Sequence, residues 1–175
     1  MNLTDRKTGS ESKQFTFCRD VAKSGFAEGD IMKKTDRLVN ILASDIEHKD
    51  VLEVACGAAD FSISAARIAN MVSCIDLDDS RLNNQVKHNN VRFQIMDASN
   101  MSYSDNEFDT IVIYNAFFHI QSQWNMIERE CKRVIKGMGK IYIIGTWSLD
   151  TNLMIDTFGD NAIWHDGFLI VEMTK

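Results

Sequence analysis

Short apolar runs alternate with longer amphipathic segments from about residue 50 onward. Five of these runs predict β-strands: Val51–Val54, Met71–Ile75, Val91–Ile95, Phe108–Tyr114 and Gly139–Thr146. The run from Phe108 to Tyr114 is continuous, which is typical of a strand covered on both faces of its sheet. Strands that alternate with helical segments favour parallel pairing through right-handed crossovers. The pattern therefore predicts an α/β fold with a mainly parallel sheet.

Helical spacing marks the segments before and between the strands. The residues Ile31, Thr35, Leu38, Val39 and Leu42 recur as on one face of an amphipathic helix, which we expect over residues 30–44. Other helices are expected over residues 14–25, 61–69, 80–88 and 124–134. The polar residues 1–13 predict a flexible N-terminal tail, so that residues 14–175 form a single domain.

The end of the chain has a different pattern. Two short apolar runs, Ala162–His165 and Phe168–Val171, flank Asp166 and Gly167. An Asp-Gly pair suits a two-residue type I′ turn, because both central positions require a positive φ. We therefore expect an antiparallel hairpin after the five parallel strands.

The balance of charges narrows the range of partners. The chain has 25 acidic and 19 basic residues, which give a net charge of −6. An acidic domain repels phosphate backbones, so nucleic acid is not an expected partner. The cluster of Lys132, Arg133 and Lys136 is interpreted as the solvated end of a helix.

The hydropathy of the chain argues against a transmembrane helix, and its cysteines argue against a metal site. No apolar run approaches the length of about 18 residues that a transmembrane helix needs, so no membrane association is expected. The four cysteines form no C-x-x-C pair and have no histidine cluster beside them, which disfavours a metal site. This cysteine usage favours a reduced, cytoplasmic compartment.

Candidate ligand-binding residues follow four of the predicted strands. In an open α/β sheet, ligands bind beyond the carboxyl ends of the strands, where the winding reverses. The segments found there are Glu53–Asp60, Asp76–Leu77, Asp97–Ala98 and Tyr114–His119. Small residues in the first segment allow close approach to the backbone, and the following helix offers N–H groups to a carboxylate. Asp76 suits two ribose hydroxyls, and Asp97 with the Ala98 amide suits an adenine edge.

These motifs resemble those of class I S-adenosylmethionine-dependent methyltransferases, especially small-molecule members of type 11/25. The resemblance runs from about Val51 to Gly145 and rests on five segments in order: Val51–Gly57, Cys74–Asp78, Asp97–Ala98, Asn106–Asp109, and Glu130 with Arg133–Gly139. It implies a doubly wound, Rossmann-like, seven-stranded sheet of order 3-2-1-4-5-7-6. It also implies methyl transfer from S-adenosylmethionine to a small-molecule acceptor by in-line displacement, driven mainly by proximity.

The resemblance also assigns roles to individual residues. The implied cofactor-binding residues are Glu53, Ala55, Cys56, Gly57, Ala59, Asp76, Leu77, Asp97, Ala98 and Asn115. His119 is the candidate general base, and Tyr114 is a second catalytic candidate. Ala55 and Ala59 stand where the family usually has glycine, and we expect the Ala59 methyl to lie in the path of the methionyl moiety.

Several of these residues have an alternative structural interpretation. Glu53 either contacts the cofactor's amino group or orients the turn by accepting backbone N–H bonds. Asp97 either reads adenine or forms a turn, and His119 is either a base or a structural residue. The aromatic residues Trp147 and Trp164, with Phe15 and Phe17, either line an acceptor pocket or pack in the core.

Two other functions compete with methyl transfer. A nicotinamide-dependent oxidoreductase would need G-x-G-x-x-G after the first strand, whereas residues 55–60 read Ala-Cys-Gly-Ala-Ala-Asp. A methyltransferase-like binding or scaffold module without enzymatic activity is the main alternative. Homo-oligomerisation is compatible with either function, since a second subunit could close an open pocket.

Overall fold

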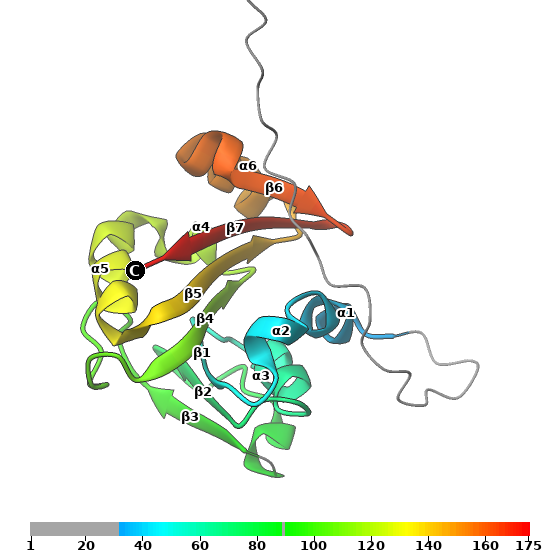
Figure 1. Cartoon of the computed structure of the whole chain (residues 1–175), viewed down its shortest axis with the longest axis vertical. Helices are drawn as coiled ribbons and strands as arrows, with labels where there is room; N and C mark the ends of the chain where they lie inside the picture. Colours follow the sequence, from blue (N-terminus) through cyan, green and yellow to red (C-terminus); the bar gives the residue numbers. More distant parts are fainter. Residues whose placement is uncertain (1–31, 89) are drawn as a thin grey trace, which may run out of the picture. The chain divides into compact units, whose positions relative to one another are not determined.

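A computed structural model describes residues 32–175 apart from residue 89, and within this part seven strands form one sheet (Figure 1). The strands are β1 (Asp50–Val54), β2 (Met71–Asp76), β3 (Val91–Ile95), β4 (Phe108–Tyr114), β5 (Ile135–Gly145), β6 (Ala162–His165) and β7 (Phe168–Thr174). Their order is β3-β2-β1-β4-β5-β7-β6. β1 to β5 pair in parallel, and β7 pairs antiparallel with β5 and β6. The predicted fold class and strand order are confirmed.

The helix expected over residues 124–134 is found at those residues as α5, whereas the helices expected over residues 30–44 and 61–69 are broken or shorter than predicted. The helices of the described part are α1 (Lys34–Ile41), α2 (Ala43–Ile46), α3 (Asp60–Ala65), α4 (Phe117–Ile120), α5 (Trp124–Val134) and α6 (Ser148–Phe158), with 3-10 turns η1 (Asn84–His88), η2 (Gln121–Gln123) and η3 (Gly159–Asn161). The helix expected over residues 30–44 is divided at Leu42 into α1 and α2. The tail over residues 1–13, the helix over residues 14–25 and Ile31 lie outside the described residues.

Two hydrophobic clusters lie on opposite faces of the sheet. Neighbouring strand residues point to opposite faces, and Val51 belongs to one cluster while Leu52 belongs to the other. The cluster around Val51 receives side chains from α1, α2 and α3, and the cluster around Leu52 receives side chains from α4, α5 and α6. Figure 1 shows α1 to α3 and α5 on opposite sides of the strands. The sheet is therefore doubly wound, and its switch point lies between β1 and β4.

The C-terminal hairpin has the predicted turn. Asp166 has φ 46° and Gly167 has φ 79°, so both central positions adopt the positive φ of a type I′ turn. Arg37 of α1 donates to the backbone oxygen of Asp166 at 2.6 Å and forms an ion pair with its carboxylate at 2.9 Å. This contact ties the hairpin to the first helix.

The polar helix expected over residues 80–88 does not form. Only the 3-10 turn η1 occupies the second half of this segment. The Oδ1 atom of Asp78 accepts from the Ser80 amide at 2.8 Å, and the Oδ1 atom of Asn83 accepts from the Gln85 amide at 3.0 Å. Such side-chain bonds stabilise turns at the expense of an α-helix. The prediction was wrong because it was based on the helical spacing of the apolar residues, whereas the turn preference of Asp and Asn determines the local structure.

β5 begins four residues earlier than predicted, at Ile135 rather than Gly139. Its pairing with β4 shifts in register, since Phe108 lies opposite Ile135 whereas Thr110 lies opposite Lys140. The irregularity brings Gly139 against Ile135 and the Asp109 carbonyl: a Cβ at this glycine would lie 2.7 Å from that oxygen. The close approach requires glycine at position 139.

Gly139→Ala should therefore destabilise the fold, whereas Gly137→Ala should not. A methyl at position 139 meets backbone and a buried side chain, and overpacking of this kind costs about 1–3 kcal/mol. A Cβ at Gly137 meets no described atom within 4 Å, so the second variant is a matched control. Urea unfolding of both variants measures the difference, and equal stabilities would contradict the requirement for glycine at position 139.

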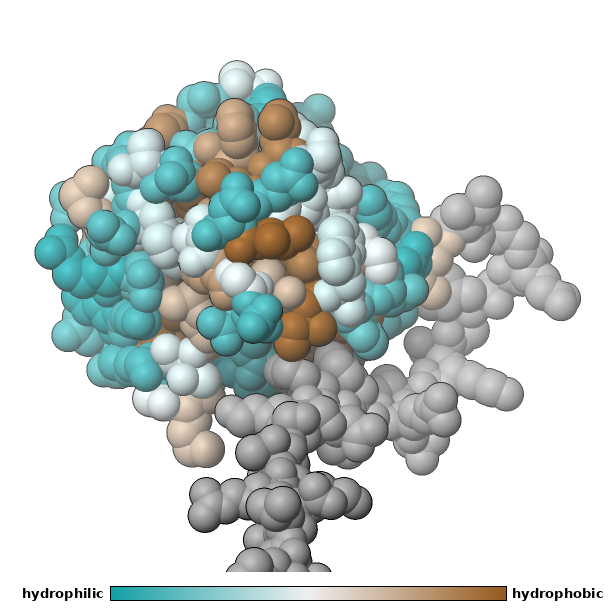
Figure 2. All heavy atoms as spheres, turned by 90° about the horizontal axis from the view of Figure 1, so that it is seen from above, coloured by the Kyte–Doolittle hydropathy of each residue, from teal (hydrophilic) through white to brown (hydrophobic). Residues whose placement is uncertain are grey.

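The surface of α6 and β6 carries large apolar side chains. Those exposed are Leu149, Ile155, Ile163 and Trp164. Figure 2 views the molecule from above and shows apolar areas within a mainly polar surface. Across the described residues, no helix combines the length and apolar character needed to cross a bilayer.

Candidate functional site

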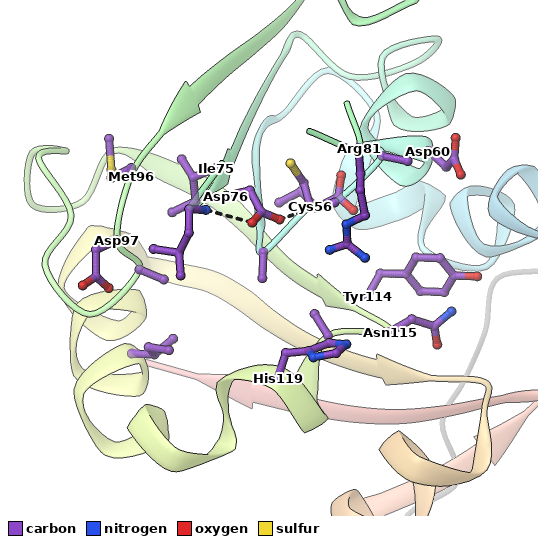
Figure 3. A pocket seen from close by; sticks show the side chains of 18 of the residues that line it. Cys56, Asp60, Ile75, Asp76, Arg81, Met96, Asp97, Tyr114, Asn115 and His119 are labelled. Carbon is purple, nitrogen blue, oxygen red and sulfur yellow. Dashed lines mark hydrogen bonds between the residues drawn. The ribbon is translucent and has the colours of Figure 1, made fainter. Parts of the chain in front are cut away.

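A cavity of about 450 Å³ opens at the carboxyl ends of the strands on either side of the switch point (Figure 3). It brings together all but one of the residues that the sequence assigns to cofactor binding and catalysis. Those that line it are Glu53, Ala55, Cys56, Gly57, Asp76, Leu77, Asp97, Ala98, Tyr114, Asn115 and His119. The remaining residue, Ala59, is fully buried in the core cluster around Val51. Its methyl group does not face the cavity, contrary to the expectation that it would lie in the path of a ligand.

The turn after β1 has an unusual backbone. Ala55, Gly57 and Ala59 have φ values of 54°, 53° and 60°. Positive φ favours glycine, because a Cβ there approaches the neighbouring carbonyl. The two alanines thus occupy positions whose backbone geometry suits glycine. These are also the positions at which the sequence departs from the family's alternating glycines.

Glu53, at the end of β1, is buried and bonded to α3. Its Oε2 atom accepts from the Ser62 amide at 3.0 Å and from the Ser62 hydroxyl at 2.5 Å. Burial raises the pKa of Glu53 to about 8, although the bonds from Ser62 oppose this effect. The carboxyl group lines the cavity and also fixes the helix that follows the turn. Both interpretations of Glu53 are therefore compatible with its position.

Asp76, at the end of β2, spans the gap between two strand ends. Its Oδ2 atom accepts from the Gly57 amide at 2.7 Å, and its Oδ1 atom accepts from the Leu77 amide at 2.8 Å. Each carboxylate oxygen can accept a further hydrogen bond. The group is half-buried at the cavity wall, where two neighbouring hydroxyls could donate to it.

Asp97 forms a turn after β3. Its Oδ1 atom accepts from the Ser99 amide at 2.8 Å, and this bond lowers the pKa of Asp97. The apolar side chains of Ile75, Leu77 and Met96 line the same part of the cavity. A flat, partly apolar ring fits this environment, and contact between Asp97 and adenine stays a prediction.

Asn115, directly after β4, connects the end of β4 with the end of β5 through its side chain. Its Oδ1 atom accepts from the Thr146 amide at 2.8 Å and from the Thr146 hydroxyl at 3.0 Å. Tyr114 beside it is half-buried, and desolvation raises the pKa of its phenol. Tyr114 therefore keeps its proton and is better suited to donate a hydrogen bond than to act as a base.

His119 of α4 lies against two aromatic rings. Its ring centroid is 5.6 Å from that of Phe118 and 6.0 Å from that of Trp147. Asp150 of α6 holds both neighbours, since it accepts from the Phe118 amide at 2.7 Å and from the Trp147 indole at 3.0 Å. Asp150 is buried, which raises its pKa. Trp147 lines the cavity, whereas Trp164 is exposed on β6 and Phe15 and Phe17 lie outside the described residues.

Comparison with known proteins identifies the family. A model described as methyltransferase domain matches residues 51–139. The chain belongs to this methyltransferase domain family. The matched region contains the turn after β1 and the carboxylates at or just beyond the ends of β1, β2 and β3. The predicted family is therefore confirmed over most of the residues that form the cavity.

Relatives and solved structures agree with this assignment. The chain is 32% identical over 108 residues to a ubiquinone/menaquinone biosynthesis C-methyltransferase of Rickettsia prowazekii, covering 53% of this chain and 42% of that protein. It is 26% identical over 111 residues to a demethylmenaquinone methyltransferase of Thermotoga maritima, covering 62% of this chain and 48% of that protein. The chain thus spans about half the length of these curated relatives. A SAM-dependent methyltransferase structure from Aquifex aeolicus shares the fold with a TM-score of 0.63 and 18% identity, covering 81% of this chain and 90% of that one.

The cavity fits S-adenosylmethionine, the cofactor that the resemblance in the sequence implies. A volume of about 450 Å³ lies within the usual range for small-molecule sites. Asp76 would hold the ribose, the apolar wall would hold the purine, and Glu53 would face the amino group of the methionyl moiety.

Arg81 and Asp150 are among the polar residues of the site region that could not be assigned to it from the sequence. Arg81 lines the cavity from the loop after β2, and its only signal in the sequence is its nearness to Asp76. Asp150 belongs to α6, which was not predicted because the apolar residues of this segment do not mark one face. Neither residue lies in the motifs that carry the resemblance.

Ala55→Gly should stabilise the methyltransferase domain, whereas Ala59→Gly should be close to neutral or destabilising. Relief of a left-handed conformation gains about 1–2 kcal/mol, and greater freedom of the unfolded chain removes about 0.4–1 kcal/mol of that gain. Ala59 additionally loses a buried methyl group, worth about 0.8 kcal/mol. Urea unfolding measures the two changes. A larger gain for Ala59→Gly than for Ala55→Gly would contradict this account.

Proposed function

We propose that the protein transfers a methyl group from S-adenosylmethionine to a small-molecule acceptor. The observation that carries the proposal is the convergence of Glu53, Gly57 and Asp76 on one cavity that also contains His119. Two methyltransferase relatives whose names refer to quinones support a small organic acceptor. The net charge of −6 disfavours nucleic acid as the acceptor. A cytoplasmic location and homo-oligomerisation stay predictions.

The chain's own residues would act mainly by positioning the two reactants. Bound S-adenosylmethionine supplies a methyl group that is activated by its sulfonium charge. Glu53 and Asp76 would orient the cofactor from one side of the cavity, and proximity would then provide much of the rate enhancement. Trp147 would exclude water from the acceptor side.

His119 is the residue best placed to move a proton. It lines the cavity beside Trp147, on the α4 segment that follows β4. An acceptor that enters with a hydroxyl or ammonium group must lose a proton, and His119 would accept it at a ring nitrogen. Tyr114 would donate a hydrogen bond from its phenol, because the raised pKa keeps it protonated.

Calorimetric titration with S-adenosylmethionine and, separately, with NADH tests the proposal. We expect micromolar affinity for S-adenosylmethionine and no heat of binding for NADH. Binding to NADH alone would favour an oxidoreductase. A folded sample that binds neither ligand would contradict the enzymatic function and favour a scaffold module.

A further inference from the structure

Arg81 introduces a positive charge into a cavity that is also lined by four carboxyl side chains. Its side chain belongs to the loop between β2 and η1, and a Cβ built on Gly57 would lie 3.2 Å from its Nη2 atom. Figure 3 shows the guanidinium directed into the cavity, on the side where Cys56, Asp60 and Tyr114 are drawn. Arg81 thus lies over the turn that connects β1 with α3.

The guanidinium is available to a ligand. Glu53, Asp60, Asp76 and Asp97 all line the same cavity, yet within residues 32–175 apart from residue 89 Arg81 forms neither an ion pair nor a hydrogen bond. Hydrogen bonds from Ser80 are the main reason why the pKa of Asp78 is lowered, and the positive charge of Arg81 makes a smaller contribution in the same direction. A cation that points into an acidic cavity without a carboxylate partner can meet an anionic group of the ligand.

The alternative anion site, the start of α3, is poorly suited to a carboxylate. α3 has only six residues, so its dipole is short. Asp60 is its first residue and lines the cavity, where its negative charge repels an anion. The turn before the helix donates the Gly57 amide to Asp76 rather than toward a ligand. The backbone at this end of the cavity therefore offers little to a negative group.

We infer that Arg81 binds the α-carboxylate of S-adenosylmethionine, an assignment that rests on the proposed function. The carboxylate and the ammonium group of the methionyl moiety are attached to the same carbon atom. If Glu53 faces the ammonium and Asp76 the ribose, the carboxylate would lie near the turn that follows β1, over which the guanidinium of Arg81 lies. A guanidinium can donate two parallel hydrogen bonds to a carboxylate, which fixes its orientation.

The decisive experiment compares two ligands that differ only in this carboxylate. Wild-type protein and Arg81→Gln are titrated calorimetrically with S-adenosylmethionine and with decarboxylated S-adenosylmethionine. We expect Arg81→Gln to weaken binding of S-adenosylmethionine about tenfold, because a hydrogen-bonded ion pair is lost. Binding of the decarboxylated ligand should not weaken.

A matched variant controls for the loss of charge. Arg129 is exposed on α5 and does not line the cavity, so Arg129→Gln should leave both affinities unchanged. An equal loss for both ligands in Arg81→Gln, or no loss for either, would overturn the assignment while wild-type binding still supports the cofactor. Absence of binding of both ligands to wild-type protein would overturn the proposed function, and the assignment with it.

Discussion

Glu53→Gln should make the protein markedly more stable at pH 8 while leaving its stability at pH 4.5 nearly unchanged. The carboxyl group of Glu53 is buried at the end of β1, where desolvation raises its pKa from 4.5 to about 8. Glutamine has the same shape and keeps an oxygen that can accept the bonds from Ser62. The substitution therefore removes the ionisation without removing the contacts.

The direction of the effect follows from proton linkage. The folded state holds a proton on Glu53 up to a pH of about 8, whereas the unfolded chain releases it near pH 4.5. Glu53 thus contributes stability that is fully present below pH 4.5 and is lost as the pH rises through 8. Across this window the loss amounts to about 5 kcal/mol, at about 1.4 kcal/mol for each pH unit.

Urea unfolding at several pH values between 4.5 and 8 measures the effect. Wild-type stability should fall across this range more steeply than that of Glu53→Gln, and the two curves should meet at the acid end. Glu47→Gln removes a carboxylate from an exposed position and should follow the wild-type curve. Parallel curves for wild type and Glu53→Gln would show that Glu53 ionises normally in the fold.

A buried, protonated carboxyl group at this position also bears on ligand binding. A cationic amino group placed beside Glu53 would favour the ionised carboxylate and lower its pKa. Binding of S-adenosylmethionine near pH 7 would then release a proton from Glu53. The same group can thus stabilise the empty turn when protonated and attract the cofactor when ionised.

The sequence predicts the fold best where one pattern dominates. The apolar run of β4 and the Asp166-Gly167 turn are both found at the predicted residues, because burial on two faces and positive φ each leave few alternatives. The helix expected over residues 80–88 fails because the bonds of Asp78 and Asn83 are local and do not appear in hydrophobic spacing.

In the candidate site, too, some residues could be predicted from the sequence and others could not. Glu53, Asp76 and Asp97 could be predicted because each lies at or just beyond the carboxyl end of a strand, and strand ends converge in this fold. The burial of Ala59 could not, because φ and the direction of Cβ within the turn depend on packing against the core. Arg81 and Asp150 reach the site region from a loop and from a helix, and neither position follows from strand order.

Asp76→Asn should weaken binding of S-adenosylmethionine about a hundredfold. Two ribose hydroxyls that donate to an ionised carboxylate form charge-assisted bonds, each worth about 1.5–3 kcal/mol. An asparagine keeps one acceptor oxygen, but its NH2 group would replace the other and would lie opposite a backbone N–H, either that of Gly57 or that of Leu77. Two donors cannot form a hydrogen bond with each other. The variant should therefore also lose about 1–3 kcal/mol of stability, because one backbone donor is left without a partner.

Two ligands separate the contact with ribose from the effect on the turn. Adenosine and 2′,3′-dideoxyadenosine differ only in the ribose hydroxyls, and competition against S-adenosylmethionine measures their affinities. If Asp76 binds the hydroxyls, Asp76→Asn weakens adenosine much more than the dideoxy compound. Asp78→Asn removes an exposed carboxylate two residues away, outside the cavity, and should change neither affinity. Equal weakening of both nucleosides by Asp76→Asn would instead mean that Asp76 acts only by holding the Gly57 turn in place.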